Sequence, residues 1–442
     1  MLLRVVERIE HAALHHGPFV SVRVLKAVPQ TVFDAIQRAF FRRTLRLAAE
    51  RSSFYREQFR RRRIDVRRIT HPSQLGDFFT TGEDIREFGP AAFIAGRADT
   101  AFETTGTTSA VPKRLYFSTR ELNAIGTASA AALRVLGLRR DDVVLSAFDC
   151  SFWVSPAVAR SAFQYVGCFH VEAGKIDPLE CYPRAAAYRP TVIAGEPSWL
   201  VRFAAIAGER GTWPVKMLLA GGENMADEAR AKVERAWSAP LYLNYGQTEA
   251  FGSLGLECRM KRGYHRNDLH FLFEIDRPAP DGYGELVYTT LSRDVMPLIR
   301  YRASDVTRLE DEPCPCGLFA RRLAPIRSRV DDMVVCGMGN VGPWVFDDIL
   351  QGVDGTGPDW QVALCHNGSF DTLELRVEVA GPAASVEPAV LARLRERFPD
   401  FWKNYAMGLY DLRVVAVPVG SLRQGRKLRR IIDNRPMAMS QC

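Results

Sequence analysis

A run of ten residues, Thr104 to Lys113, combines hydroxyl side chains with residues that favour turns. It reads TTGTTSAVPK, and four threonines around one glycine cannot form an apolar face. Hydroxyls and backbone N–H groups on a flexible turn are suited to surround an anion. The stretch therefore predicts a phosphate-binding loop, with an ordinary polar surface loop as the alternative.

Two more polar stretches follow apolar runs that have the composition of strands. They read AGGEN (220–224) and NYGQTEA (244–250). In open α/β sheets, ligands bind where the strands end and the turns begin. Both stretches are therefore candidates for ligand contacts.

Three cysteines and one histidine form a separate group of metal-binding candidates. Cys314 and Cys316 lie in EPCPCGLF, a turn rich in proline and glycine, while Cys258 and His265 lie in ECRMKRGYH. Two close thiols together with a separate Cys/His pair can make a closed tetrahedral zinc site. We expect one structural zinc ion there. The Cys-x-Cys spacing is tighter than in the usual zinc knuckle, so free thiols are the alternative.

The size and charge of the chain restrict its class. At 442 residues it exceeds one ordinary core, so two or more domains are expected. The formal charge is +8, but lysine supplies only eight of the 59 basic residues, which indicates an arginine bias along the whole chain. The sequence contains no nucleic-acid-binding signature. We therefore expect no nucleic acid as a partner, and a basic face that meets a phosphorylated cofactor or an acidic carrier protein.

The N-terminus and the cysteine count bear on location. Charged residues interrupt the opening MLLRVVERIEHAALHHG, unlike the apolar region of a signal peptide. No apolar run is long enough to cross a bilayer. Nine cysteines without an export signal do not indicate a disulfide framework. The sequence predicts a cytoplasmic protein with no membrane partner.

The elements that must position these residues follow from the apolar pattern. Residues from about 30 to 60 show the spacing of an amphipathic helix. Beyond the threonine loop, short apolar runs alternate with helical stretches. The runs are 141–148, 191–196, 215–223 and 240–246, and the helical stretches are 155–166, 197–207 and 226–237. This rhythm predicts an α/β domain with a largely parallel sheet.

The pattern changes past residue 330. Residues 360–379 read as two strands around an Asn367-Gly368 turn, followed by a helix over 385–398 and a strand over 412–419. This order predicts a small α+β domain. We expect a large N-terminal domain at 1–328 that binds ATP and the acid, a hinge at 329–332, and a small mobile C-terminal lid domain at 333–442.

Five segments stand in a fixed order along the chain. They are TTGTTSAVPK, YGQTE, PLIRYRASDV, SRVDDMVVCGMGNVGPWVFDDIL and QGRKLRRIIDNR. In this order they resemble the adenylate-forming superfamily: its phosphate loop, its Tyr-Gly-x-Thr-Glu motif, the segment that ends in the ribose-binding aspartate, the hinge, and the C-terminal lysine loop. The phenylacetate–CoA ligase branch is most similar, because SSFYREQFRRRRID and LGDFFTTGEDIRE also resemble its N-terminal region. The resemblance spans roughly residues 45 to 435.

The resemblance implies an ATP site with Mg²⁺. The residues expected to cradle the β- and γ-phosphates are Thr104, Thr105, Gly106, Thr107 and Thr108, with Lys113 assisting unless it is a solvated surface lysine. Thr248 would contact the α-phosphate and Glu249 would hold Mg²⁺. Asp305 would bind the ribose hydroxyls, with Tyr301 near the nucleotide and Arg329 at the ribose or phosphate. The remaining expected ATP contacts are Gly222, Glu223, Tyr245 and Gly246.

The resemblance also assigns the moving parts. Asp331 matches the hinge position, where backbone rotation would exchange one C-terminal face for another. Lys427 matches the lysine that contacts the substrate carboxylate and the α-phosphate during adenylation. The expected catalytic residues are Lys427, Thr248 and Glu249.

Departures from the family pattern concern the acid substrate. In FDCSFWVSP, Asp149 replaces a residue that is usually small, and Glu196 stands where the branch tends to be neutral. The residues expected around the acid are Phe148, Asp149, Trp153, Glu196 and Gly221. An unpaired buried carboxylate is costly. We therefore expect an acid that carries a donor substituent such as an amino or hydroxyl group.

These observations predict an AMP-forming acid–thiol ligase. ATP and an aromatic or similar hydrophobic carboxylic acid would give acyl-AMP, and the acyl group would pass to CoA or to a carrier-protein phosphopantetheine thiol. An enzyme that transfers the acyl group to an amine or another small nucleophile is the alternative. A homodimer is left open by the sequence. Because Glu249, Asp305 and Lys427 are all present, a degenerate binding homologue is disfavoured.

Overall fold

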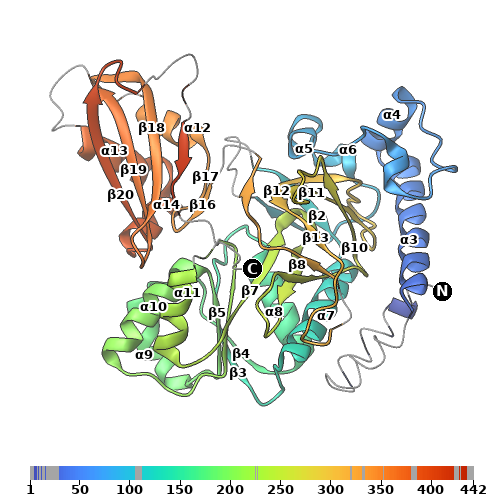
Figure 1. Cartoon of the computed structure of the whole chain (residues 1–442), viewed down its shortest axis with the longest axis horizontal. Helices are drawn as coiled ribbons and strands as arrows, with labels where there is room; N and C mark the ends of the chain where they lie inside the picture. The colour runs from blue at the N-terminus through green and yellow to red at the C-terminus, as the bar shows by residue number, and fades with distance from the viewer. Residues whose placement is uncertain are drawn as a thin grey trace. The chain divides into compact units, whose positions relative to one another are not determined.

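The protein is described by a computed structural model that comprises two compact units. It describes residues 4–6, 8, 11, 15, 29–104, 112–223, 225, 227–318, 321–330, 334–351, 353–379, 386–422, 428 and 430–435. The first unit comprises residues 1–105, 111–174 and 242–328, and the second comprises residues 106–110, 175–241 and 329–442. In Figure 1 the colour follows the residue number, from blue at the N-terminus to red at the C-terminus.

Two helices begin the first unit where the sequence predicted one. Helix α3 (Gln30–Arg51) and helix α4 (Ser53–Arg61) are separated at Ser52, whose backbone is extended (φ −84°, ψ 127°). The Ser52 hydroxyl accepts a hydrogen bond from the N–H of Tyr55 and so caps α4. The apolar period continues through the break because both helices pack on the same core.

The first unit contains one parallel strand pair and several antiparallel ones. Strands β3 (Val143–Ala147) and β4 (Phe169–Glu172) are parallel, with α8 (Ser155–Val166) beside them and α7 (Thr119–Leu136) packed against α8. The antiparallel strands are β7 (Leu241–Gln247), β8 (Gly252–Glu257), β9 (Tyr264–Arg266), β14 (Arg322–Leu323) and β13 (Leu309–Glu310), in that spatial order. A largely parallel sheet is therefore only part of the fold, because tight turns reverse the chain after β7 and β8.

Two smaller antiparallel groups complete the first unit. Strands β1 (Thr100–Glu103) and β2 (Arg114–Phe117) form a hairpin whose ends flank the threonine loop. Strands β10 (Phe271–Asp276), β11 (Gly284–Thr290) and β12 (Tyr301–Thr307) form the other group. Short segments α5 (Gly82–Phe88), α6 (Pro90–Phe93) and the 3₁₀ turn η1 (Pro72–Leu75) connect α4 to β1.

The second unit begins with a parallel pair covered by helices. Strands β5 (Val192–Gly195) and β6 (Met217–Gly221) are parallel and fully buried. Helices α9 (Pro178–Tyr188), α10 (Pro197–Arg210) and α11 (Asp227–Trp237) lie together beside β5, in green in Figure 1. These bounds match the predicted strand–helix alternation closely, because each apolar run is bounded by proline or glycine.

The chain past residue 333 folds into the small sheet that the sequence predicts. Strands β18 (Thr356–His366) and β19 (Asp371–Val379) pair antiparallel around the Asn367 turn, while β20 (Tyr410–Pro418) and β21 (Ile431–Asp433) join in parallel. The predicted helix is α13 (Val386–Arg397). The remaining elements are β16 (Val334–Cys336), β17 (Gly339–Val341), α12 (Pro343–Leu350) and α14 (Pro399–Ala406).

Candidate functional site

A lysine, a glutamate and a tyrosine meet in the first unit. The Lys113 ammonium is paired with the Glu249 carboxylate, and the Tyr301 hydroxyl donates to the same carboxylate oxygen at 2.9 Å. The Lys113 ammonium also donates to the Tyr301 hydroxyl at 3.2 Å. The side chains of Lys113 and Glu249 are only 15% and 7% exposed. The alternative of a solvated surface lysine at position 113 is therefore wrong.

The turn that carries Glu249 depends on a glycine. Residues Thr248–Ala250 form a single 3₁₀ turn, η2, between β7 and β8. A Cβ atom on Gly246 would lie 2.0 Å from the carbonyl oxygen of Gly252 on the opposite strand. Only glycine allows this close approach. The Tyr-Gly-x-Thr-Glu sequence is thus a hairpin end that presents Thr248 and Glu249 together.

The charge state of Glu249 depends on its neighbours. Burial by itself raises the pKa of this carboxyl, but the charge and hydrogen bond of Lys113 outweigh it, with Tyr301 contributing in the same direction. The net result is a pKa lowered from the usual value for glutamate. Glu249 is therefore ionised at neutral pH, as a cation ligand must be.

Replacing Lys113 by methionine is expected to move the acid limb of activity to higher pH. Without the ammonium, burial is the dominant influence and raises the pKa of Glu249, so protonation begins at a higher pH. Lys113→Arg, which keeps the charge, is the control. The measurement is kcat/KM for ATP–pyrophosphate exchange between pH 5 and 8. Identical acid limbs in the two variants would contradict this account.

The lowered pKa of Glu249 also makes the folding stability of the protein depend on pH. Because the folded pKa of Glu249 is lowered, its contribution to stability is present above the unfolded pKa and is lost as the pH falls through the folded pKa. In Lys113→Met this contribution should be absent at neutral pH, whereas wild type should lose it only in acid.

A second carboxylate, Asp305, lies in a distorted part of β12. It accepts hydrogen bonds from the Tyr245 hydroxyl at 2.6 Å and from the Gln247 amide at 2.7 Å. Between the pairs Glu285↔Val306 and Val287↔Arg302 the register shifts, so three residues of β12 oppose Leu286 alone. Such bulges redirect side chains next to binding sites.

The backbone just before Asp305 supports this interpretation. Ser304 has φ +61°, in the left-handed region that non-glycine residues seldom adopt. Strain of this kind persists where the surrounding structure fixes it and is frequent at ligand sites. A carboxylate has about four acceptor positions and can accept from several donors at once, including the two hydroxyls of a diol.

Tyr301 is held in place by the N-terminal helices. The Tyr55 hydroxyl shares a hydrogen bond with the Thr80 hydroxyl (3.0 Å) and accepts one from the N–H of Ile299 (3.0 Å). The Thr80 hydroxyl donates to the carbonyl of Ile299 at 2.8 Å, and Thr80 is bridged to Tyr301 itself. The N-terminal segments that resemble the ligase branch thus support β12 directly.

The base of the threonine loop is described, but most of the loop is not. The Thr104 N–H donates to the Lys113 carbonyl at 3.0 Å, and the Lys113 N–H donates to the Thr104 hydroxyl at 3.1 Å. These bonds close the loop at its two ends. The other predicted phosphate contacts, Thr105, Gly106, Thr107 and Thr108, lie outside the described residues, as do the hinge residue Asp331 and the predicted catalytic Lys427.

The second unit contains a buried charged group at the ends of β5 and β6. The Lys175 ammonium is paired with Glu196, with side-chain exposures of 4% and 7%. Nearby, the Glu223 carboxyl accepts from the N–H and the hydroxyl of Ser198, both at 2.9 Å. Burial, together with the charge of Glu196, raises the pKa of Glu223 to about 8. Glu223 therefore holds its proton at neutral pH.

This pairing changes the argument about the acid substrate. The sequence suggested that Glu196 would be an unpaired buried carboxylate, but Lys175 already compensates its charge. Asp149, which is half-buried, is the other carboxylate that the sequence placed near the substrate. Phe148, Asp149 and Trp153 are half-buried in the segment after β3, and Asp149 accepts from the N–H of Ser151 at 3.0 Å.

Three other predicted site residues lie at strand ends. Gly221 ends β6, Gly222 follows it in the left-handed region (φ +92°), and Arg329 ends β15 (Ser328–Arg329).

The predicted metal ligands converge. The ligand atoms of Cys258, His265, Cys314 and Cys316 all lie within 4.8 Å of one another. The Cys258 and Cys314 sulfurs are 3.7 Å apart, and the Cys316 sulfur is 3.3 Å from His265 Nε2. Zn–S bonds of about 2.3 Å at tetrahedral angles place two sulfurs about 3.8 Å apart. The donor set and its spacing therefore fit zinc.

The strands explain why these four residues meet. β9 carries His265 and pairs with β14, where Arg322 lies opposite His265. Cys258 follows β8, and Cys314 and Cys316 lie between β13 and β14. Gly263 has φ +76°, and a Cβ there would lie 2.2 Å from the carbonyl oxygen of Leu323. None of the described cysteines forms a disulfide.

Sequence reasoning missed several polar residues around these groups. Gln247 lies inside the quoted YGQTE motif, yet its amide bond to Asp305 requires the bulge in β12. Lys175 is one of only eight lysines in the chain, and this scarcity could have drawn attention to it. Arg293 donates to the backbone carbonyl of Glu249. Nothing in the sequence distinguishes it from the many other arginines of the chain.

Two family models match the chain. The model for the AMP-binding enzyme matches residues 101–280, and the model for the AMP-binding enzyme C-terminal domain matches residues 339–435. The first match contains the threonine loop and Glu249, whereas the second contains the small sheet and Lys427. The two matches thus bracket the predicted hinge.

Relatives of known activity are similar over most of their length. A phenylacetate–coenzyme A ligase from Thermus thermophilus is 27% identical over 441 residues, covering 93% of this chain and 98% of that protein. One from Aromatoleum evansii is 26% identical, covering 93% and 97%. One from Escherichia coli is 24% identical, covering 78% and 82%.

Solved structures share the fold. A 2-hydroxyisobutyryl-CoA ligase in complex with its adenylate and CoA aligns with a TM-score of 0.77 at 22% identity, covering 92% of this chain and 91% of the other. The amide bond synthetase McbA from Marinactinospora thermotolerans aligns with a TM-score of 0.55 at 17% identity, covering 76% of this chain and 68% of the other. With the family models, the relatives and the geometry in agreement, the chain belongs to the adenylate-forming, AMP-binding enzymes, in their phenylacetate–CoA ligase-like branch.

Proposed function

We propose that the protein activates a carboxylic acid with ATP and transfers the acyl group to CoA. The observation that carries the proposal is the buried Lys113–Glu249 pair at the base of the threonine loop, with the carboxylate of Asp305 on β12. A nucleoside triphosphate is bound by a cationic side chain for its phosphates, a ligand for its metal ion and an acceptor for its ribose hydroxyls. Lys113, Glu249 and Asp305 offer one group of each kind. The relatives that are named as acid–CoA ligases support the choice of acceptor.

The first half-reaction joins two anions. A carboxylate oxygen of the acid attacks the α-phosphorus of ATP, the bond to the β-phosphate oxygen breaks, and pyrophosphate leaves with the electron pair. Lys113 and the threonine loop would neutralise the developing charge on the phosphates. Asp305 would hold the ribose, and Thr248 would contact the α-phosphate.

Mg²⁺ fits the same site. Glu249 offers a buried, ionised carboxylate whose only described cationic side-chain partner is Lys113. Mg²⁺ is usually bound by one or two carboxylates plus substrate phosphates, and it would neutralise phosphate charge here. Glu249 would hold the ion, and Tyr301 would keep the carboxylate oriented through its 2.9 Å hydrogen bond.

The second half-reaction transfers the acyl group. The CoA sulfur attacks the acyl carbon, the bond from that carbon to the phosphate oxygen breaks, and AMP leaves while the thiol proton passes to solvent. Acyl-AMP is a mixed anhydride, so this step needs positioning and water exclusion more than a strong base. A carrier-protein thiol would react in the same way.

We propose an aromatic or similarly hydrophobic acid, with a donor substituent that meets Asp149. The half-buried rings of Phe148 and Trp153 support an apolar wall in the same segment. The test is pyrophosphate release with a panel that includes phenylacetate, benzoate, their amino and hydroxy derivatives, and 2-hydroxyisobutyrate. If an unsubstituted acid has the highest kcat/KM, the donor requirement is wrong, and if no acid releases pyrophosphate, the proposed function is wrong.

Acceptors are separated in a second assay. Supplied acyl-AMP is offered to CoA, to a carrier protein with its phosphopantetheine arm, and to simple amines. Because the amide bond synthetase McbA has the same fold, amines belong in this comparison. Amide formation faster than thioester formation would replace the ligase proposal with an amide-forming enzyme.

We also propose that Cys258, His265, Cys314 and Cys316 hold one structural zinc ion. Four protein ligands leave no open position, so the ion would brace β8, β9 and β14 without taking part in catalysis. Protein purified without added metal is expected to contain about one zinc per chain. Cys314→Ser should lose the zinc and lower the melting temperature.

Cys181→Ser is the matched control for the zinc prediction. Cys181 is 1% exposed and lies on α9, away from the four ligands in sequence. This variant should keep its zinc even if it is less stable. Wild-type protein that carries no zinc, and whose melting temperature does not change with a chelator, would refute the site.

A further inference from the structure

A buried arginine connects the two segments that carry the opposed charges of the site. Arg293 donates through one guanidinium nitrogen to the backbone carbonyl of Glu249, and through the other to the carbonyl of Tyr116 at 3.4 Å. Tyr116 lies on β2, the strand that leaves Lys113, whereas Glu249 lies on the turn after β7. One planar group thus spans the Lys113 strand and the Glu249 turn.

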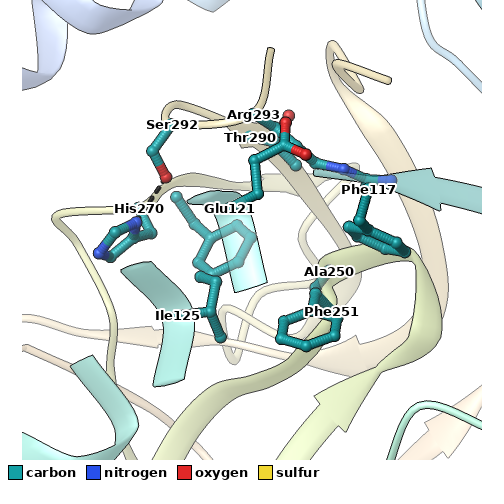
Figure 2. Close-up of a pocket in the computed structure, with 10 residues that line it drawn as sticks. Phe117, Glu121, Ile125, Ala250, Phe251, His270, Thr290, Ser292 and Arg293 are labelled. Atoms are coloured by element: carbon teal, nitrogen blue, oxygen red, sulfur yellow. Dashed lines mark hydrogen bonds between the residues drawn. The ribbon is translucent and has the colours of Figure 1, made fainter. Parts of the chain in front are cut away.

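The guanidinium is itself held on several sides. Its carbon lies 4.1 Å from the centre of the Phe117 ring, and Figure 2 shows it above that ring with Glu121 beside it. Arg293 is 5% exposed. Burial lowers the pKa of Arg293, and the negative charge of Glu121 is the largest influence opposing this. The rigid fork of arginine suits such a two-carbonyl contact, which an ammonium cannot reproduce.

Glu121 fixes the backbone on which Arg293 is carried. One carboxylate oxygen accepts from the N–H groups of Asp294 and Val295, the latter at 2.8 Å. The other oxygen accepts from the N–H and hydroxyl of Ser118 at the start of α7. The position of the guanidinium is therefore set by α7 and β2 together, before any ligand binds.

The cavity beside Arg293 is too small to hold a substrate. It is lined by Phe117, Ile125, Phe251 and the His270–Ser292 pair, among others (Figure 2). Its volume is about 10 Å³, at the lower limit for a single water molecule. Neither ATP nor an organic acid fits there. We therefore expect Arg293 to act on the reaction through the groups that it holds.

We propose that Arg293 is a positioning residue for the nucleotide step, setting the direction of the Glu249 carboxylate through the backbone of its turn. The inference rests on the proposed function. Arg293→Met removes both carbonyl contacts, and the turn becomes free to rotate the carboxylate away from Lys113. The affinity for ATP in the presence of Mg²⁺ should therefore weaken, although the residue touches neither.

The test measures binding as well as turnover. ATP binding is followed by calorimetry at stepped Mg²⁺ concentrations, and ATP–pyrophosphate exchange is measured in parallel. Arg293→Met is expected to raise the Mg²⁺ concentration for half-maximal ATP affinity by about tenfold, the size of one lost hydrogen bond to a charged group. Arg293→Lys, which restores one donor and the charge, should show a shift of about threefold on the same grounds.

Arg230→Met is the matched control. Arg230 is 9% exposed and also donates to a backbone carbonyl, that of Leu241 at 2.5 Å, but it lies on α11 in the second unit. It should lower the melting temperature and leave the Mg²⁺ midpoint unchanged. An Arg293→Met midpoint equal to that of Arg230→Met would overturn the proposal. If Arg293→Met does not fold, an unshifted midpoint in Arg293→Lys would overturn it instead. Wild-type protein that binds no ATP at any Mg²⁺ concentration would refute the proposed function itself.

Discussion

Glu249→Gln is expected to reduce acyl-AMP formation by about 100- to 1,000-fold, the loss typical of one electrostatic contact in a reaction that develops charge. The amide keeps the shape of the side chain and its contact with the Tyr301 hydroxyl, so the turn should remain folded. It removes the ionised oxygen that would hold Mg²⁺. It also leaves the Lys113 ammonium, 15% exposed, without its carboxylate partner.

The measurement is ATP–pyrophosphate exchange over a range of Mg²⁺ concentrations. Glu257→Gln is the matched control, because Glu257 is a buried glutamate on the neighbouring strand β8 that accepts from the N–H of Leu243 at 2.8 Å. An amide oxygen can accept the same bond, so exchange should stay near the wild-type rate. Comparable losses in both variants would mean that Glu249 has only a structural role.

The second large effect is expected from Lys427→Ala, and it should be specific to one step. An ammonium between the attacking carboxylate and the α-phosphate stabilises charge only while those groups react. Adenylation should fall by about 100- to 1,000-fold. Thioester formation from supplied acyl-AMP should stay near wild type, because the lysine is not required once the anhydride exists. The prediction rests on the resemblance of QGRKLRRIIDNR to the family's lysine loop.

Asp331→Pro is the companion variant. If the small domain turns at this hinge between the two half-reactions, fixing φ there should impair thioester formation more than adenylation. Both variants are assayed in both half-reactions, with circular dichroism to confirm folding. Equal loss of the two steps in Lys427→Ala would show that this lysine does not act in one step alone.

Much of the architecture could be predicted from local pattern alone. The bounds of β5, β6, α8 and α11 follow the apolar runs and their flanking Pro and Gly residues, because propensity and burial agree there. The hairpin at Asn367 followed from its turn sequence in the same way. The helix predicted over 30–60 was wrong in one respect: the hydroxyl of Ser52 caps a second helix, and this break does not interrupt the apolar period.

Motif order likewise identified the family and led us to propose Glu249 and Asp305 as site residues, whereas the four metal-ligand candidates came from their residue types and spacing. A motif is recognisable in the sequence because the geometry of its turn allows only certain residue types. Gly246 is an example, because the close approach of the opposite strand leaves no room for a Cβ atom. These four residues could be proposed as zinc ligands because thiols and imidazole are the side chains that structural zinc sites use.

What the sequence could not provide is partnership between segments that are distant in the chain. Lys113 and Glu249 are 136 positions apart, Lys175 pairs with Glu196 just after β5, and Arg293 reaches both Tyr116 and Glu249. Such contacts depend on how strands and helices pack, as does the bond between Gln247 and Asp305, which lies in the bulge of β12. The sequence by itself determined which charges the site has, whereas the tertiary structure decided which of them neutralise one another, because electrostatic energy depends on distance and burial and not on order along the chain.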